Sequence, residues 1–131
     1  MANFLPVCEP LLAGNELAYV TEAVSTGWIS SAGKYVKAFE EAFAQYCGVK
    51  HGIAVCNGTV ALHLALVALG VGKGDEVIIP DFTMMASALA VCYTGAMPVF
   101  VDADAETWNI SPAAVAAKIT PRTQVVMPVH I

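Results

Sequence analysis

The sequence predicts an α/β fold in which a mostly parallel β-sheet lies between two layers of helices. From His51 onward, short apolar runs alternate with helical segments, and this alternation is typical of parallel βαβ units with right-handed crossovers. The short runs are apolar throughout, as expected for strands that helices cover on both faces. The expected fold class is therefore a three-layer α/β sandwich.

The composition is unusually apolar for an independent domain of 131 residues, with 57% hydrophobic and only 13% charged residues. We therefore expect another polypeptide surface to cover part of it. The mean hydropathy is +0.65, yet no stretch approaches the roughly 20 uninterrupted apolar residues that span a bilayer. The N-terminus lacks the basic segment and long apolar core of a secretory signal. We expect a cytoplasmic protein without a membrane partner.

Charge and cysteine content exclude several classes of site. The net charge is −5 and the six basic residues are scattered, which argues against a nucleic-acid partner. The four cysteines are far apart and form no C-x-x-C pair, so neither a zinc site nor a disulfide framework is indicated. We expect reduced, mostly buried cysteines and no metal site.

The first 50 residues predict an extended arm and two helices. The arm, Phe4 to Leu12, contains two prolines, and a helix follows from Gly14 to about Thr26. The connector from Trp28 to Ser31 could contact a ligand or a partner, or Trp28 could simply cover the edge of the core. The second helix, roughly 33–46, carries aromatic residues at helical spacing, and we expect them in the core. Gly27 and Gly48 are the expected helix C-caps.

The remaining elements alternate regularly. We expect strands at 51–56, 76–79, 98–101 and 123–129, and helices at 59–69 and 84–93, with a short helix that begins near Pro112. Ser111 is the expected N-cap of that short helix, and proline suits its first turn. The chain contains no internal repeat or linker and stops directly after a strand, so we expect it to be the amino-terminal part of a longer protein.

The strongest functional signal is the break at Asn57, Gly58 and Thr59 between a predicted strand and an apolar helix. Such a corner leaves the first N–H groups of the helix unpaired, and the helix dipole adds partial positive charge there. Helix N-termini of this kind bind anions, most often phosphate. We therefore hypothesise that these three residues hold a cofactor phosphate. The motif matches neither the dinucleotide fingerprint nor the P-loop.

Other polar residues follow the predicted strands and should reach the same edge of the sheet. They are Asp81 to Met84, Asp102, Asp104 and His130. For Asp102 and Asp104 we favour turn and capping roles over metal binding, because no His or Cys accompanies them. His63 lies in an apolar helix and is interpreted as a core residue. His130 is an open candidate for a substrate contact.

Several motifs then occur in the order in which the sugar aminotransferases have them, and the whole chain resembles the amino-terminal part of a DegT/DnrJ/EryC1/StrS enzyme. They are G-W-I-S-S at 27–31, F-E at 39–40, N-G-T-x-A-L-H-L at 57–64, G-D-E-V-I-x-P at 74–80, P-V-F-V-D at 98–102, I-T-P-R-T at 119–123 and P-V-H at 128–130.

This resemblance implies the aspartate-aminotransferase fold, known as fold type I, and the cofactor pyridoxal 5′-phosphate (PLP). It implies transfer of an amino group, usually from glutamate, to a nucleotide-linked keto-deoxysugar, by a homodimer with its active site at the subunit interface. Gly58 and Thr59 would hold the cofactor phosphate beside Asn57. Residues 1–32 would form an arm, helix and connector, and residues 33–131 the first part of the PLP-binding domain. Trp28, Ser30 and His130 are candidate substrate contacts.

Two departures limit what the resemblance transfers. The family commonly has an aromatic residue at the position of Met84, stacked on the pyridoxal ring, and methionine makes a less directional contact. The Schiff-base lysine and the aspartate that pairs with the pyridine nitrogen lie beyond Ile131 in the family, so no catalytic residue is assigned in this chain. A sugar dehydratase of the same fold and a non-catalytic binding protein remain as alternatives.

Overall fold

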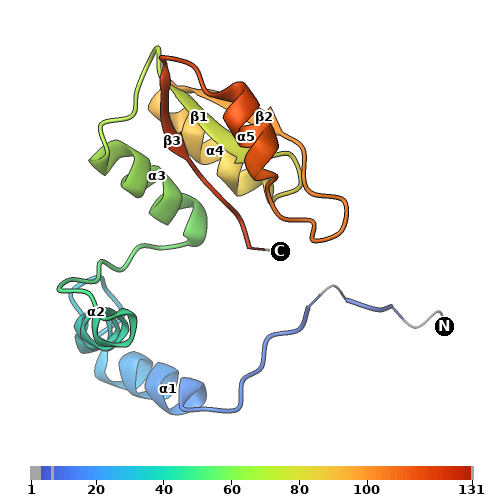
Figure 1. The fold of residues 1–131 in the computed structure, drawn as a ribbon. Helices are drawn as coiled ribbons and strands as arrows, with labels where there is room; N and C mark the ends of the chain where they lie inside the picture. The colour runs from blue at the N-terminus through green and yellow to red at the C-terminus, as the bar shows by residue number, and fades with distance from the viewer. Residues whose placement is uncertain (1–3, 7, 131) are drawn as a thin grey trace. The chain divides into compact units, whose positions relative to one another are not determined.

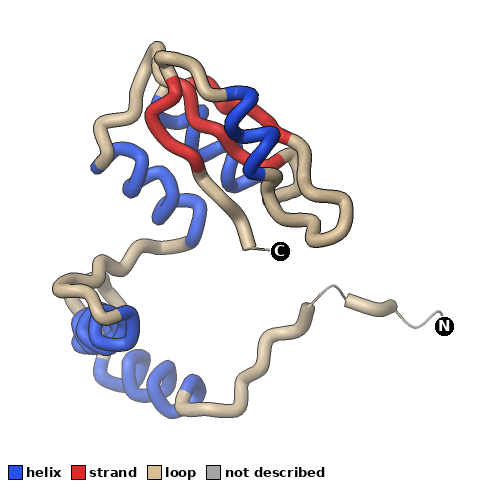
Figure 2. Tube along the Cα trace, viewed as in Figure 1, coloured by secondary structure: helices blue, strands red, loops and turns tan. Residues whose placement is uncertain are grey.

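The computed structural model describes residues 4–6 and 8–130, which form two compact units that divide between Ala54 and Val55. The first unit contains α1 (Glu16–Thr26) and α2 (Lys34–Cys47). The second contains α3 (Gly58–Ala68), β1 (Glu76–Pro80), α4 (Met85–Thr94), β2 (Met97–Val101), α5 (Pro112–Lys118) and β3 (Thr123–Val126), as Figures 1 and 2 show.

The sheet of the second unit is parallel, as predicted. Its strand order is β2-β1-β3, and β1 pairs in parallel with both neighbours. Every residue of the central strand β1 is buried. The carboxyl ends of the strands therefore lie at one edge of the sheet, where parallel α/β proteins bind their ligands.

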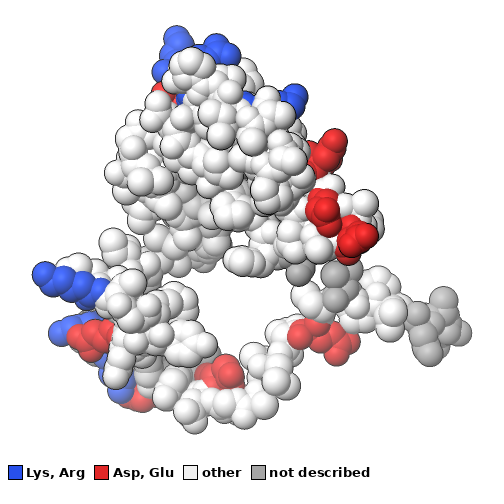
Figure 3. All heavy atoms as spheres, in the orientation of Figure 1, with Lys and Arg blue, Asp and Glu red and all other residues white. Residues whose placement is uncertain are grey.

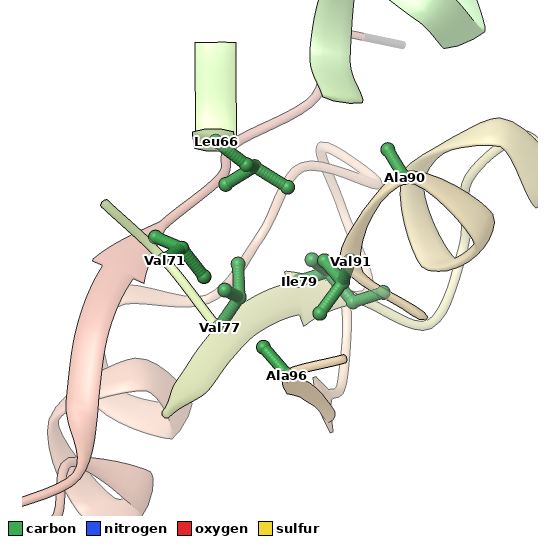
Figure 4. Close-up of a cluster of buried hydrophobic side chains, with 7 residues drawn as sticks. All are labelled: Leu66, Val71, Val77, Ile79, Ala90, Val91 and Ala96. Carbon is green, nitrogen blue, oxygen red and sulfur yellow. The ribbon is translucent and has the colours of Figure 1, made fainter. Parts of the chain in front are cut away.

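The core of this unit joins β1 to α3 and α4. Figure 4 shows its apolar side chains, which are Leu66, Val71, Val77, Ile79, Ala90, Val91 and Ala96. Ile78 is one step out of phase with Val77 and Ile79 on the strand and is equally buried, so β1 is covered on both faces. Complete coverage of the other strands was a wrong expectation, because β2 and β3 each pair with only one described strand and stay partly exposed.

The helix caps predicted at Ser111, Gly27 and Gly48 are confirmed, and Asn57 is an N-cap that was not predicted as one. Asn57 and Ser111 each accept a hydrogen bond from a backbone N–H of the first helical turn, at 3.0 and 3.3 Å, and Pro112 begins α5. Gly27 and Gly48 end α1 and α2 in the left-handed conformation that glycine adopts without strain.

The predicted strand at 51–56 is absent, and its backbone packs on α2 instead. Gly52 passes so close to Glu40 that an added Cβ would lie 2.6 Å from the Glu40 carbonyl oxygen. The Ala54 N–H donates a hydrogen bond of 2.8 Å to the Glu40 carboxylate. A strand needs a neighbouring strand, and no described strand pairs with this segment. The predicted strand at 123–129 also ends early, at Val126.

The apolar faces of the first unit are exposed. The expectation that the aromatic residues of α2 lie in the core is therefore wrong for the described part of the chain. Phe39 and Phe43 stack on each other with ring centroids 5.5 Å apart but stay half-exposed, and Tyr46 is 88% exposed. The apolar face of α1 is likewise exposed. The helical spacing of apolar residues correctly identified one apolar face on each of α1 and α2. Within the described part of this unit, no other segment covers these faces.

The cysteines are free, as predicted, but the expectation that most are buried is wrong. Cys8, Cys47, Cys56 and Cys92 are all exposed. Most of the surface seen in Figure 3 is uncharged, and its basic residues form small separate groups. Within the described ranges, no helix is both long and apolar enough to cross a bilayer.

Candidate functional site

The corner at the start of α3 has the geometry of an anion site. Asn57 is extended, at φ −166° and ψ 171°, and its side-chain oxygen accepts the Val60 N–H while its carbonyl accepts the Ala61 N–H. Among the described residues, the N–H groups of Gly58 and Thr59 have no hydrogen-bond acceptor. Two free donors therefore stand at the positive end of an 11-residue helix.

An open groove of about 690 Å³ extends from this corner. Gly58 and Thr59 line it from the start of α3, Met84 from the start of α4, and His130 from the segment after β3. With Thr83, which also lines the groove, the second unit thus brings together five of the residues that the sequence singled out. Asn57 contributes from behind as the cap that fixes the corner.

Met84 lies at the mouth of this groove. It is the N-cap of α4 in extended conformation and is 78% exposed, so its thioether is free to contact a ligand. Phe82 does not replace it, because Phe82 lines a different depression. The neighbouring phenylalanine therefore does not supply the aromatic ring that the resemblance leads us to expect in the groove.

The remaining polar residues at the carboxyl edge form a second, separate depression of about 520 Å³. It is lined by Asp81, Phe82, Asp102, Asp104 and Trp108, with the rings of Phe82 and Trp108 5.1 Å apart. The edge loops expected to converge on one site are therefore divided between two, and the segment after β1 is itself divided, with Asp81 and Phe82 here and Thr83 and Met84 in the groove. Within the described ranges, no cluster of three potential metal ligands occurs.

Asp104 has the turn role predicted for it. Its carboxylate accepts hydrogen bonds from the Glu106 N–H, at 3.1 Å, and from the N–H and hydroxyl of Thr107, at 2.9 and 3.0 Å. The bonds from Thr107, and then the one from Glu106, lower the pKa of Asp104. Trp108 follows with φ +60°, the one non-glycine residue with positive φ in the described backbone.

Trp28 and Ser30 belong to the first unit. Trp28 is 60% exposed and lines a depression there with Glu22, Lys34 and Tyr35. Glu22 pairs with Lys34 and accepts a hydrogen bond from the Tyr35 hydroxyl at 2.5 Å. The bond with Lys34 is the main cause of the lowered pKa of Glu22, and the same bond raises the pKa of Lys34. Ser30 accepts the Gly33 N–H through its carbonyl, at 3.1 Å.

Sequence reasoning missed two residues beside these sites. Ser87 lies on α4 and lines the groove, although it is only 4% exposed. Its only signal was that it stands four positions after Thr83, at the start of the helix that follows that residue. Trp108 gave no signal, because nothing in the sequence indicates a positive φ at a tryptophan.

The residues of the groove fit a phosphate-bearing cofactor. The free N–H groups of Gly58 and Thr59 supply donors, and a Cβ on Gly58 would meet nothing within 4 Å, so there is open space beside the corner. No lysine or arginine lines the groove. The geometry is that of a parallel α/β protein with two free N–H donors at a helix N-terminus, an arrangement suited to a phosphate group.

The chain belongs to the DegT/DnrJ/EryC1/StrS aminotransferase family, whose model matches residues 10–131. It is 58% identical over 127 residues to the GDP-perosamine synthase of Caulobacter vibrioides, an alignment that covers 97% of this chain and 34% of that protein. The chain therefore spans about a third of the length of this relative.

Solved structures agree with the family. The crystal structure of 3-amino-5-hydroxybenzoic acid synthase has a TM-score of 0.85 and 45% identity, over 95% of this chain and 33% of that one. NtdA from Bacillus subtilis, solved with bound cofactor PMP, has a TM-score of 0.81 and 36% identity, over 88% of this chain and 26% of that one. The similarity extends to proteins crystallised with a pyridoxamine cofactor.

Proposed function

We propose that this chain is the part of a PLP-dependent sugar aminotransferase that holds the cofactor phosphate. The complete enzyme transfers an amino group from an amino-acid donor, usually glutamate, to a nucleotide-linked keto-deoxysugar. The observation that carries the proposal is the pair of free N–H groups at Gly58 and Thr59, which open into a groove together with Met84 and His130. A family relative solved with PMP supports the choice of cofactor.

In this proposal the chain's own residues bind and orient. Gly58 and Thr59 donate to the phosphate, Asn57 keeps their N–H groups in place by capping α3, and Met84 contacts the ring. When bound, the cofactor supplies the electron sink that amino-group transfer requires. His130 lines the groove, and we propose it, with Trp28 and Ser30 of the first unit, as a substrate contact.

The remaining parts of the proposal concern the complete protein. The covalently bound lysine and the aspartate for the pyridine nitrogen come from polypeptide outside residues 1–131, since no lysine lines the groove. We further propose a cytoplasmic homodimer, which the exposed apolar faces of α1 and α2 support. Residues 1–32 form its arm, helix and connector, and residues 33–131 the first part of its PLP-binding domain.

Gly58→Pro in the protein expressed from its complete coding sequence tests this function. Gly58 is the first residue of α3, where proline is tolerated, and Asn57 has the extended backbone that a residue before proline prefers. The substitution therefore removes one N–H donor without breaking the helix. We expect PLP affinity to fall by about tenfold, measured by titration, at an unchanged melting temperature.

Gly58→Ala is the matched control, because it keeps the N–H, and we expect it to bind PLP more tightly than Gly58→Pro. Equal affinity in the wild type and in Gly58→Pro would contradict the role of this corner.

Met84 is the observation that favours a second candidate, a non-catalytic relative that keeps the fold. The sugar dehydratase of the same fold is a further alternative within the enzyme class. Borohydride reduction of the complete protein with PLP separates them, because only a lysine-linked cofactor becomes permanently attached. Attachment supports the aminotransferase, whereas binding without attachment supports one of the other two.

A further inference from the structure

We propose that Thr83 donates a hydrogen bond to an anionic oxygen of the cofactor bound in the groove, and that Ser87 is the positioning residue that holds the Thr83 hydroxyl. The inference rests on the proposed function, because it assumes that PLP binds at this corner. It adds a polar contact from the segment that precedes α4 to the contacts that α3 makes.

The two hydroxyls form a pair at the wall of the groove. Thr83 Oγ1 and Ser87 Oγ are 2.8 Å apart, and both residues line the groove with Gly58 and Thr59. Ser87 is 4% exposed, whereas Thr83 is half-buried. The Ser87 hydroxyl is therefore withdrawn from solvent, and Thr83 is the more accessible member of the pair.

The hydrogen-bond inventory indicates which hydroxyl donates to which. Each hydroxyl has one proton to donate. If Thr83 donated to Ser87, the Ser87 proton would need a second acceptor, and the described residues offer none. If Ser87 donates to Thr83, the buried hydroxyl is satisfied and the proton of Thr83 is free. The second arrangement leaves no buried donor unpaired, and so it is the stable one.

The pair is not needed to cap the helix that follows. Met84 is the N-cap of α4 and makes no side-chain cap bond, and no N–H of the first turn donates to Thr83. Thr94, at the other end of α4, shows what a purely structural threonine does. Its hydroxyl donates to the Val91 carbonyl at 2.7 Å and accepts the Ala96 N–H at 3.3 Å. Thr94 thus has a protein acceptor for its proton, whereas Thr83 has a proton to spare.

A free hydroxyl proton beside two free N–H groups suits an anionic acceptor. PLP offers two such acceptors, its phosphate and the phenolate oxygen of its ring. Both present the same chemistry to Thr83, namely an oxygen with negative charge that accepts a short, charge-assisted bond. Comparing phosphate-bearing and phosphate-free ligands identifies which oxygen is contacted.

The experiment uses the protein expressed from its complete coding sequence and measures the Kd for PLP by titration. Thr83→Val keeps the shape of the side chain and removes its hydroxyl, whereas Thr83→Ser keeps the hydroxyl. Ser87→Ala removes the positioning hydroxyl. Thr94→Val is the matched control, since it removes a threonine hydroxyl from α4, the helix that carries Ser87, at a site outside the groove.

We expect Thr83→Val to weaken PLP binding by about 10- to 100-fold and Ser87→Ala by about fivefold, with Thr83→Ser and Thr94→Val close to wild type. Ser87→Ala should add no further loss in the Thr83→Val background, because Ser87 acts only through Thr83. A merely structural role would make the two losses add. Melting temperatures of all variants identify any loss that comes from unfolding.

The outcomes distinguish this inference from the function on which it rests. If the wild type does not bind PLP, the proposed function fails. If the wild type binds and Thr83→Val binds equally well, or if Thr94→Val loses as much affinity as Thr83→Val, the Thr83 contact is refuted. Loss of both PLP and inorganic phosphate binding in Thr83→Val supports the phosphate as the acceptor, and loss of PLP and pyridoxal with inorganic phosphate unchanged supports the ring oxygen.

Discussion

Met84 stands where the resemblance to the sugar aminotransferases leads us to expect an aromatic residue. Its side chain is exposed at the groove, and its polarisable sulfur can contact a ring without fixing the orientation of that ring. An indole at this position adds directional stacking, which contributes about 0.5–1.5 kcal/mol beyond burial. The identity of this one side chain therefore sets how firmly the ring is oriented.

We predict that Met84→Trp tightens PLP binding by about 2- to 12-fold in the complete protein, as measured by titration. Met85→Trp is the matched control, because Met85 is the next residue, is similarly exposed and does not line the groove. Equal gains in both variants would mean that the added indole acts on the surface in general and that Met84 does not contact the ring.

Asp104 gives the loop after β2 a defined pH dependence. Hydrogen bonds from Thr107 and Glu106 lower its pKa in the folded chain, while in the unfolded chain it titrates near about 3.9. A group with a lowered folded pKa stabilises the fold above its unfolded pKa, and this contribution disappears as pH falls through the folded pKa.

We therefore predict that the amide resonances of Glu106 and Thr107 titrate together in NMR spectra with a midpoint below about 3.9. In Asp104→Asn this shared transition should be absent. A midpoint at or above the unfolded value would show that the three hydrogen bonds do not persist in solution.

At the scale of elements, a polar cluster joins the start of β1 to the start of β3. Glu76 is buried, and its carboxylate pairs with Arg122 and accepts the Thr120 hydroxyl at 2.5 Å. Beside it the ladder shifts register, from Glu76 opposite Thr123 to Val77 opposite Val125. Because a one-residue slip would reverse the faces of every side chain in β3, this cluster helps determine which residues after β3 line the groove.

We predict that Arg122→Met lowers the free energy of unfolding by about 1–3 kcal/mol, because it leaves the buried Glu76 carboxylate without its cation. Urea denaturation of the complete protein measures the loss. Lys118→Met is the control, since it also removes a surface cation and no ion pair involves Lys118 in the described part of the chain. Equal stability of the two variants would show that the pair with Glu76 contributes little.

At the scale of the whole molecule, the chain exposes far more apolar surface than a soluble domain usually does. The exposed side chains include Leu17, Val20 and Val24 on α1 and the aromatic face of α2. The chain also spans only about a third of its relatives, at 34% of the Caulobacter protein. Both facts agree with a unit that functions inside a larger assembly.

We predict that residues 1–131 alone transaminate no keto-sugar and form no permanent cofactor adduct. The groove contains no lysine, so borohydride treatment with PLP should leave no site-specific mass addition. Mass spectrometry checks this, with the complete protein as the positive control. A single modified lysine in the isolated chain would overturn the assignment of the reactive lysine to polypeptide outside it.

The features that the sequence predicts correctly are local ones. Ser111 caps α5 as predicted, because its hydroxyl needs only the backbone N–H three residues further along the chain as its partner. The strand at 51–56 failed for the opposite reason. Its run of apolar residues is typical of a strand, yet a strand also requires a neighbouring strand to pair with. Here the backbone of the segment contacts Glu40 of α2 instead, and the Ala54 N–H donates to the Glu40 carboxylate.

The sequence alone therefore determined the family, from motifs in order along the chain, and it predicted the parallel α/β alternation and the turn at Asn57 to Thr59 from residues that are close together. Only the tertiary structure decided how the strand ends are divided between two depressions, and that Ser87 supports Thr83 beside the corner. Those arrangements arise where α3, α4 and the segment after β3 meet, and contacts between distant segments depend on packing that no local pattern records.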